Sequence, residues 1–294
     1  MEDLLGHECY SGLAAVMCGF GQNPLKRICC LHINSPKRNS MFHIVGISTC
    51  KGRLQHIKQT AAAFLEATPN NVGYLVVDYD CPEHSGEWVR TTLGNTGRAE
   101  ALVMRAKPGA FHKTIALNAG SKHAISKMGA EYLLYFDADT VIRPGFIEQI
   151  IPLLQRDRFI IAEPTGEEDL TGLMIVHKSI FIASNGFEES FRSWGAEDLE
   201  FRLRLFAKHN YKFDVVSCEN LVPIHHDNAM RVQFYTDKDI DFSNKRNFYK
   251  LLQMYAAYTG KSLKLKGLKD SDNPDKEELI KLLSLHPRNT SKDR

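Results

Sequence analysis

Short apolar runs alternate with longer amphipathic segments along the first half of the chain. Residues 42–48, 74–78, 101–104 and 132–136 are short and mostly apolar, which predicts buried strands. The spacing of apolar and small side chains predicts helices at 54–65, 87–93, 114–128 and 146–154. This alternation of strands and helices predicts an α/β fold with a mostly parallel central sheet flanked by helices.

The pattern changes after about residue 155. Strands are predicted at 173–176, 213–216 and 221–224, and helices at 193–208 and 245–258. The charged stretch that follows predicts a tail with one short helix at 276–285. The second half of the chain therefore differs in organisation from the first.

Composition narrows the class of protein. The 294 residues include 43% hydrophobic side chains, enough for a substantial core. The 37 basic and 35 acidic side chains give a net charge of +2, which disfavours nucleic acid as a partner. No apolar segment approaches the ~20 residues that a membrane-spanning helix needs, although contact with a membrane surface stays open.

Cysteine usage and the first residues predict a location. The seven cysteines are an odd number, and four of them lie within the first 30 residues, unlike the framework of a disulfide-rich secreted domain. Glu2, Asp3 and Glu8 replace the basic start of a signal peptide. These features predict reduced thiols in a cytoplasmic protein.

Asp137 and Asp139 directly follow the strand predicted at 132–136. Ligands of parallel sheets bind beyond the carboxyl ends of the strands, where Asp78 also falls. Hard divalent cations prefer carboxylate oxygens, and a cation that bridges phosphate oxygens stabilises a departing diphosphate. An Asp-x-Asp sequence also occurs in ordinary turns and caps, but the apolar strand before it favours a metal site.

A second acidic pair, Glu197 and Asp198, follows Trp194 and Gly195 in a predicted helix. A carboxylate near a helix N-terminus is held in its ionised form, which suits a general base. The Trp194 ring offers a face for stacking on a sugar. The alternative is that both acids only accept hydrogen bonds from amides of the first turn.

A histidine pair, His225 and His226, follows the strand predicted at 221–224 and precedes Asp227. Imidazole is a good ligand for Mn²⁺ and its neighbours, so either histidine could complete a coordination begun by Asp139. A histidine is more often a packing residue, and the pair alone supports the metal site only modestly.

In order and spacing, these motifs resemble those of GT-A fold glycosyltransferases, close to the family-2 enzymes. The second half of the chain is similar to the C-terminal region shared by β-1,4-galactosyltransferases and chondroitin-type polymerases. The matching segments are 48–53, 76–80, 113, 118–120, 136–139, 185–191, 194–198 and 225–226. The chain departs from the usual pattern at Asn185 and Ala196, where glycines are common, and at 111–113, which lack an arginine.

The resemblance implies a role for each matching residue. The implied nucleotide and sugar contacts are Ser48, Thr49, Arg53, Asp78, Asp80, Lys113, Asn118, Asp137, Trp194 and Gly195, with Asp78 or Asp80 on the uracil base. Asp139 would ligate the metal and Asp137 would face the metal-bound phosphate, with His225 ahead of His226 as a further ligand. Glu197 would contact sugar hydroxyls, and Asp198 would be the catalytic base.

The implied activity is that of an inverting, metal-dependent hexosyltransferase. It would use Mn²⁺ or Mg²⁺ to move a hexose or N-acetylhexosamine from a UDP-sugar to a hydroxyl of a glycan, a lipid-linked saccharide or a protein. One alternative is a sugar nucleotidyltransferase, which the single glycine in 48–53 disfavours. The other alternative is an inactive domain that binds nucleotide sugars or carbohydrates.

The resemblance also implies a domain organisation. Residues 1–40 would be an irregular leader and residues 266–294 a charged tail. Between them, residues 41–265 would form the catalytic domain, with a nucleotide-binding half at 41–155 and an acceptor half at 156–265.

Overall fold

The computed structural model describes residues 42–105, 109–163, 170 and 172–260. The predicted leader at 1–40 and the predicted tail at 266–294, including its short helix, lie outside the described residues. No helix in the described ranges is both long enough and apolar enough to cross a membrane.

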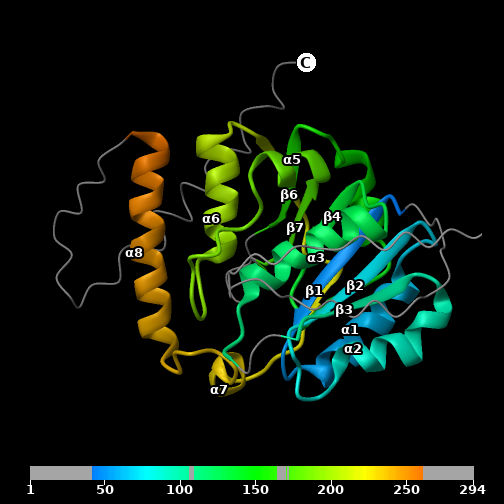
Figure 1. Ribbon diagram of the computed structural model, residues 1–294. Helices are drawn as coiled ribbons and strands as arrows, with labels where there is room; N and C mark the ends of the chain where they lie inside the picture. Colours follow the sequence, from blue (N-terminus) through cyan, green and yellow to red (C-terminus); the bar gives the residue numbers. More distant parts are fainter. Residues whose placement is uncertain (1–41, 106–108, 164–169, 171, 261–294) are drawn as a thin grey trace, which may run out of the picture. The chain divides into compact units, whose positions relative to one another are not determined.

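Seven strands form one sheet in the order β3-β2-β1-β4-β7-β6-β8 (Figure 1). Their bounds are β1 Ile44–Cys50, β2 Val72–Asp78, β3 Ala99–Val103, β4 Tyr132–Tyr135, β6 Arg158–Ala162, β7 Met174–His177 and β8 Lys212–Val216. Strand β7 pairs antiparallel with β4 and β6, and the other neighbours pair parallel. The prediction of a mostly parallel central sheet is therefore confirmed.

A second, two-stranded ladder lies outside this sheet. It pairs β5 Thr140–Ile142 antiparallel with β9 Leu221–Pro223. The helices are α1 Leu54–Ala67, α2 Ser85–Trp88, α3 Lys113–Lys127, α4 Phe146–Ile150, α5 Lys178–Ala183, α6 Glu197–Leu203, α7 Asn228–Val232 and α8 Ile240–Thr259. A π-helical turn continues α6 through Arg204–Lys208.

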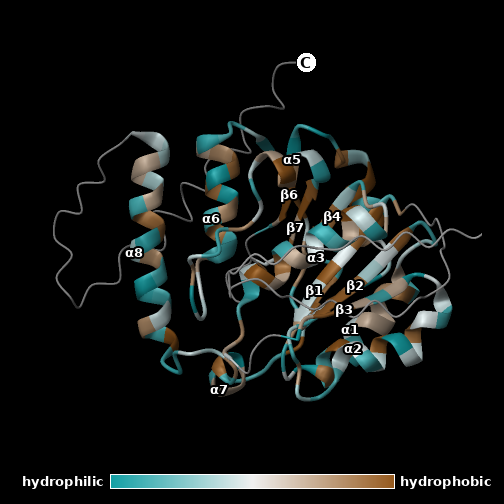
Figure 2. Cartoon of the chain, viewed as in Figure 1, coloured by the Kyte–Doolittle hydropathy of each residue, from teal (hydrophilic) through white to brown (hydrophobic). Residues whose placement is uncertain are grey.

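Each face of the central sheet has its own core. On one face, Ile44 packs in a cluster with Ile57 and Phe64 of α1. On the other, Val45 packs in a cluster with Leu117 of α3. Because strand side chains alternate between faces and both faces are covered, the central strands are mostly apolar (Figure 2).

A glycine lets α3 approach the sheet closely. A Cβ atom at Gly120 would lie 2.6 Å from Val77 Cγ2 and 3.2 Å from Ile47 Cγ2. Any larger side chain at this position would push the helix away from β1 and β2. The close contact matters for the site because Lys113 stands in the first turn of the same helix.

Helix α8 packs through an apolar stripe rather than over its whole surface (Figure 2). Phe248, Leu251 and Leu252 form a third hydrophobic cluster with Phe191 and with Leu203 of α6. The side chain of Asp239 caps the helix by accepting a hydrogen bond from the Phe242 amide at 2.9 Å. This cap explains why α8 begins at Ile240 and not at 245, as the hydrophobic pattern predicts.

Several elements differ from the prediction. The helix predicted from residue 193 begins only at Glu197, because Ser193, Gly195 and Ala196 have positive φ and cannot be helical. Strands β5 and β6 and helix α7 are missing from the prediction, since each has at most five residues and no clear periodicity.

A buried ion pair anchors α6. The Arg204 guanidinium lies 2.6 Å from Glu200 Oε1 and also donates hydrogen bonds to the carbonyl oxygens of Ser184 and Gly186. Glu200 is fully buried, and its Oε1 also accepts a hydrogen bond from the Tyr258 hydroxyl at 2.7 Å. The pair therefore ties the helix that begins with Glu197 to the segment after α5.

We expect Arg204→Met to destabilise the protein by about 3–5 kcal/mol, because Glu200 would keep a buried charge without its cationic partner. The double variant Arg204→Met with Glu200→Leu removes both charges and is expected to lose less stability. Denaturant unfolding monitored by circular dichroism measures both. A single variant that costs no more than the double variant would contradict this role for the ion pair.

Candidate active site

One pocket gathers most of the predicted site residues. It is lined by Thr49, Lys51, Arg53, Phe111, Lys113, Asp137, Ala138, Asp139, Gly172, Trp194, Gly195, Ala196, Glu197, Asp198, Leu199, His226, Met230, Arg231, Phe234, Tyr235 and Asn244. Thr49 lies near the end of β1, and Lys51 and Arg53 come just after it. Asp137 and Asp139 come just after β4. The pocket therefore lies at the carboxyl ends of neighbouring parallel strands, closed by segments from the second half of the chain.

A single lysine stands among three carboxylates at the centre of the pocket. Lys113 Nζ lies 2.8 Å from Asp137 Oδ1, 3.0 Å from Asp198 Oδ2 and 3.2 Å from Glu197 Oε1. The end of β4 and the start of α6, about 60 residues apart in the sequence, thus converge on one ammonium group. This arrangement brings together the two acidic pairs that the sequence singles out.

Burial and charge oppose each other in this cluster. Burial lowers the pKa of Lys113, but the carboxylates of Asp137, Asp198 and Glu197 outweigh it and hold the pKa well above its usual value. Burial raises the pKa of Asp198 to about 7, although the Lys113 ammonium opposes the rise. Burial likewise raises the pKa of Asp137 against the effect of Lys113. The ammonium is therefore what limits the protonation of both aspartates.

Asp139 meets a histidine instead of the lysine. His226 Nε2 lies 2.6 Å from Asp139 Oδ2, and the His226 side chain is 4% exposed. Burial would raise the pKa of Asp139, but the hydrogen bond and charge of His226 bring it below its usual value. His225, ranked first by the resemblance, is exposed. The structure thus places His226, and not His225, against Asp139.

Asp139 and His226 could hold a divalent cation between them. Within the described ranges, no group of three or more His, Cys, Asp or Glu side chains is arranged to hold a metal ion. A carboxylate oxygen and an imidazole nitrogen are a donor pair that suits Mn²⁺. A cation at this position would take its remaining ligands from a bound substrate or from water.

Arg53 supplies positive charge beside the Asp139 pair. Its Nη2 donates a hydrogen bond to the Met230 carbonyl oxygen at 3.0 Å. Its Nη1 is buried and has no hydrogen-bond partner among the described residues. A buried guanidinium nitrogen that lines a pocket and lacks an acceptor is suited to bind an anionic group such as a phosphate.

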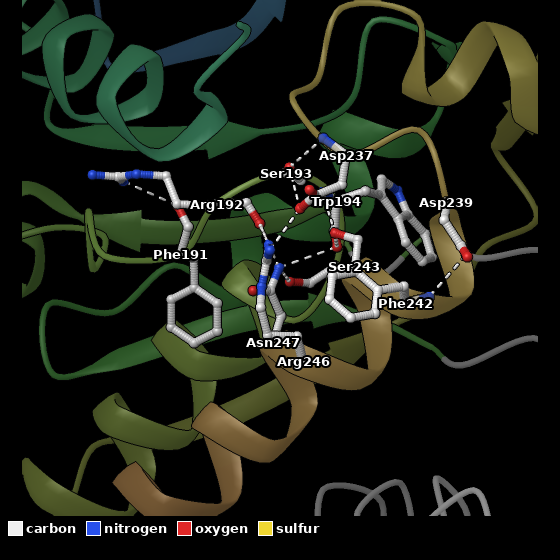
Figure 3. Close-up of polar contacts among 11 residues, drawn as sticks. Phe191, Arg192, Ser193, Trp194, Asp237, Asp239, Phe242, Ser243, Arg246 and Asn247 are labelled. Atoms are coloured by element: carbon white, nitrogen blue, oxygen red, sulfur yellow. Dashed lines mark hydrogen bonds and ion pairs between the residues drawn. The ribbon is translucent and has the colours of Figure 1, made fainter. Parts of the chain in front are cut away.

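Trp194 and Gly195 belong to a loop, residues 192–196, whose backbone forms hydrogen bonds with side chains of α8 (Figure 3). The Arg231 guanidinium lies 5.4 Å from the centre of the Trp194 ring. Ser243 and Asn247 of α8 form hydrogen bonds with the backbone of the loop. The loop thus presents an aromatic face to the pocket and leads directly into Glu197 and Asp198.

Four predicted contacts lie outside the pocket lining and have polar partners elsewhere. Ser48 Oγ donates to the Phe136 carbonyl oxygen at 3.1 Å, and Asn118 bonds both the N–H and the carbonyl oxygen of Phe187. Asp78 accepts hydrogen bonds from the amides of Cys81 and Gly86. Asp80 Oδ2 lies 4.0 Å from Lys51 Nζ. These contacts shape the backbone around the pocket.

The sequence did not single out several pocket residues. Lys51 lies between two predicted contacts, and its neighbours were the only signal available. Arg231, Phe234 and Asn244 come from segments without a recognisable motif. Their place in the pocket depends on how the second half of the chain folds back, which single-sequence periodicity does not reveal.

Comparison with solved structures identifies this architecture. The structure of S. aureus TarS residues 1–349 in complex with UDP-GlcNAc superposes with a TM-score of 0.58 at 15% identity, covering 74% of this chain and 66% of that one. The chain has the GT-A glycosyltransferase fold. It spans less than two thirds of that TarS fragment, so the likeness concerns the fold alone.

Two further GT-A glycosyltransferases are similar in structure. A mannosyltransferase from Pyrobaculum calidifontis, in complex with GDP-Man and Mn²⁺, has a TM-score of 0.49 at 13% identity and covers 75% of this chain and 72% of that one. Drosophila β-1,4-galactosyltransferase 7 has a TM-score of 0.47 at 14% identity, with 68% and 76% covered.

The sequence itself matches one protein family. Residues 164–227 match the family described as the N-terminal domain of galactosyltransferase. No curated protein sequence matches the chain. The matched segment includes Trp194, Glu197, Asp198 and His226, whereas the pocket residues from Met230 to Asn244 lie beyond it. The resemblance seen in the sequence is confirmed.

The raised pKa of Asp198 predicts a pH-dependent stability. Folded Asp198 binds a proton up to about pH 7, whereas the unfolded carboxyl releases it near its ordinary pKa of about 4. Its contribution to stability is therefore complete below about pH 4 and is lost as the pH rises towards 7. Asp198→Asn is expected to remove this loss, so its stability relative to the parent should rise by at least about 1 kcal/mol over that range.

Urea unfolding at a series of pH values measures this difference. Asp241→Asn, a change at an exposed carboxylate in the first turn of α8, is the matched control and should show a much smaller trend. A stability difference that does not change with pH for Asp198→Asn would contradict the raised pKa.

Proposed function

We propose that this chain is an inverting, metal-dependent glycosyltransferase that takes its sugar from a UDP-sugar and places it on an acceptor hydroxyl. The observation that carries the proposal is the convergence of Asp137 and Asp198 on Lys113, within 2.8 and 3.0 Å of one nitrogen atom. This convergence puts the acidic pair after β4 and the acidic pair of α6 in one pocket. The proposed catalytic domain is residues 41–265.

The donor would lie at the strand ends. Arg53 offers a buried nitrogen without an acceptor, and Lys51 and Thr49 line the same side of the pocket. These groups suit the phosphates of a nucleoside diphosphate. The UDP-GlcNAc in the TarS structure supports a nucleotide-sugar donor for this fold.

A divalent cation would be held by Asp139 and His226, with Asp137 facing the same phosphates. When bound, Mn²⁺ or Mg²⁺ acts as a Lewis acid that neutralises the charge developing on the departing diphosphate. Asp139 Oδ2 and His226 Nε2 face each other at 2.6 Å, so a bound cation would replace this hydrogen bond with a bond to each of the two side chains.

Asp198 would act as the general base. Its carboxylate takes the proton from the acceptor hydroxyl while the hydroxyl oxygen bonds to the anomeric carbon. The bond from that carbon to the diphosphate oxygen breaks on the opposite face, and UDP leaves with the electron pair. Lys113 lowers the pKa of Asp198 and so keeps more of this base ionised at neutral pH. Glu197 and the Trp194 ring would orient the sugars.

A screen of donor hydrolysis tests the activity. UDP-galactose, UDP-glucose, UDP-GlcNAc and UDP-GalNAc are each incubated with the protein, with and without Mn²⁺. Mn²⁺-dependent release of UDP from at least one donor is expected. Release of pyrophosphate from UTP and a sugar phosphate would indicate a nucleotidyltransferase instead. UDP binding without any turnover, even with acceptor sugars present, would indicate an inactive binding domain.

Asp198→Asn is expected to lower kcat by about 100-fold or more, because the amide cannot accept the proton in the transition state. UDP affinity, measured by calorimetry in Mn²⁺, should change little, since Asp198 is assigned no contact with the nucleotide. Near-normal turnover of this variant would refute the assignment of the base.

Asp139→Ala and His226→Ala are each expected to weaken Mn²⁺-dependent UDP binding by about 10–100-fold, on the scale of losses at metal sites. Binding measured in EDTA should change far less. His225→Ala is the matched comparison, because this histidine is adjacent in the sequence but is exposed. A larger effect from His225→Ala than from His226→Ala would show that the assignment of the ligand is wrong.

A further inference from the structure

The loop that leads into α6 is held in an unfavourable backbone conformation. Ser193 has φ of 60°, Gly195 has 106° and Ala196 has 67°. Two of these residues carry a Cβ atom, which crowds the backbone at positive φ. Ala196 is also the N-cap of α6 and makes no capping hydrogen bond with its side chain. Such a conformation persists only where the surrounding structure enforces it.

Helix α8 supplies the enforcing contacts (Figure 3). Ser243 Oγ accepts a hydrogen bond from the Trp194 amide at 3.0 Å and donates one to the Trp194 carbonyl oxygen at 2.8 Å. Asn247 Nδ2 donates to the carbonyl oxygens of Arg192, Trp194 and Gly195 at 2.9, 3.1 and 3.0 Å. Two N–H bonds of one amide are therefore shared among three carbonyl groups.

A second set of contacts holds the outer end of the loop. Ser193 Oγ donates to Asp237 Oδ2 at 3.0 Å and accepts from the Asp237 amide at 3.1 Å. Arg246 lies 2.6 Å from the same carboxylate oxygen and donates to the Arg192 carbonyl oxygen at 2.7 Å. These contacts of Ser193, Asp237 and Arg246 are more exposed than those of Ser243 and Asn247, so we expect them to stabilise the loop less.

These polar contacts are not needed to attach α8. Phe248, Leu251 and Leu252 already bury the helix against Phe191 and Leu203. Ser243 is 0% exposed and Asn247 is 2% exposed, and a buried polar side chain is unfavourable unless its hydrogen bonds are made. Among the described residues, the side-chain hydrogen bonds of Ser243 and Asn247 all go to residues 192–195.

We propose that Ser243 and Asn247 are positioning residues that hold the loop 192–196 in its positive-φ conformation and thereby fix Trp194 and Asp198 in the pocket. The proposal rests on the proposed glycosyltransferase function for its catalytic consequence, but its structural part can be measured without activity. Asn244, on the same turn of α8, lines the pocket beside Gly195. The helix thus reaches the site both directly and through the loop.

The test compares Ser243→Ala and Asn247→Ala with a control on the same helix. Leu251→Ala should destabilise the packing of α8 without touching the loop, because Leu251 is fully buried in the apolar cluster. Gln253→Ala, at an exposed position, controls for substitution in α8 as such. Each protein is examined by hydrogen exchange of the peptide covering 192–196, by calorimetry with UDP and Mn²⁺, and by kcat for UDP release.

Both positioning variants should speed amide exchange in 192–196 by at least about tenfold under native conditions, because the Trp194 amide and its neighbours lose their local closure. They should lower kcat by about 10- to 100-fold, as expected for a small misplacement of the reacting groups. The Kd for UDP should stay within about twofold. Leu251→Ala should lower the melting temperature at least as much as either positioning variant. It should cause neither the selective increase of exchange in 192–196 nor the loss of kcat.

A second-site variant separates positioning from general damage. Ala196→Gly removes the crowding at positive φ, so the loop needs less support to keep its conformation. Added to Asn247→Ala, it should restore kcat at least about threefold relative to Asn247→Ala alone. A variant that had merely lost stability would gain nothing specific in kcat from this change.

The outcomes are distinguishable. Unchanged exchange of 192–196 in Asn247→Ala, or equal effects on exchange and kcat from Leu251→Ala, would overturn the proposal. If the variants exchange faster but the parent protein turns over no UDP-sugar, the result would count against the glycosyltransferase function and still support the role of Ser243 and Asn247 in holding the loop. Faster exchange with a selective fall in kcat supports both.

Discussion

The charge of Lys113 is the constraint on which the site depends. Three carboxylates lie within 3.2 Å of its ammonium nitrogen, and without a cation they would repel one another in a buried pocket. The lysine begins α3, which Gly120 allows to lie close to the sheet. The end of β4 and the start of α6 can therefore remain together before any substrate arrives. Within the pocket, this one side chain links the acidic residues of the proposed donor and acceptor halves.

The second half of the chain also supplies the contacts that fix the position of Asp198. Helix α6 is tied down by the buried Arg204–Glu200 pair at its C-terminal end and by the loop 192–196 at its N-terminal end. Helix α8 holds that loop in turn. A carboxylate that must meet a hydroxyl within hydrogen-bond reach has little tolerance for movement, so a site of this kind needs support on both sides.

Much of the fold could be read from the sequence, because the buried strands of a parallel sheet are short apolar runs. The site was readable where acidic pairs coincide with the ends of elements, as at Asp137 and Asp139 after β4 and at Asp198 in the first turn of α6. The conformation of residues 193–196 was not readable, because Trp194 and Ala196 are compatible with a helix in sequence. The positive φ of Ser193, Gly195 and Ala196 depends on contacts with α8, which come from a distant part of the chain. Asn244 and Arg231 were missed since only tertiary folding brings them to the pocket.

The small ladder of β5 and β9 has a consequence for the proposed cation. It pairs Thr140 with Pro223, so Asp139 precedes one strand where Ile224 follows the other, and the Ile224 amide donates to the Asp139 carbonyl oxygen at 2.7 Å. Strand register thus decides which imidazole of two adjacent ones arrives at the aspartate. An insertion of one residue after Pro223 would bring His225 to the position of His226, and a deletion would bring Asp227 there. The length of this short segment therefore constrains how such a chain can change while keeping the proposed cation site.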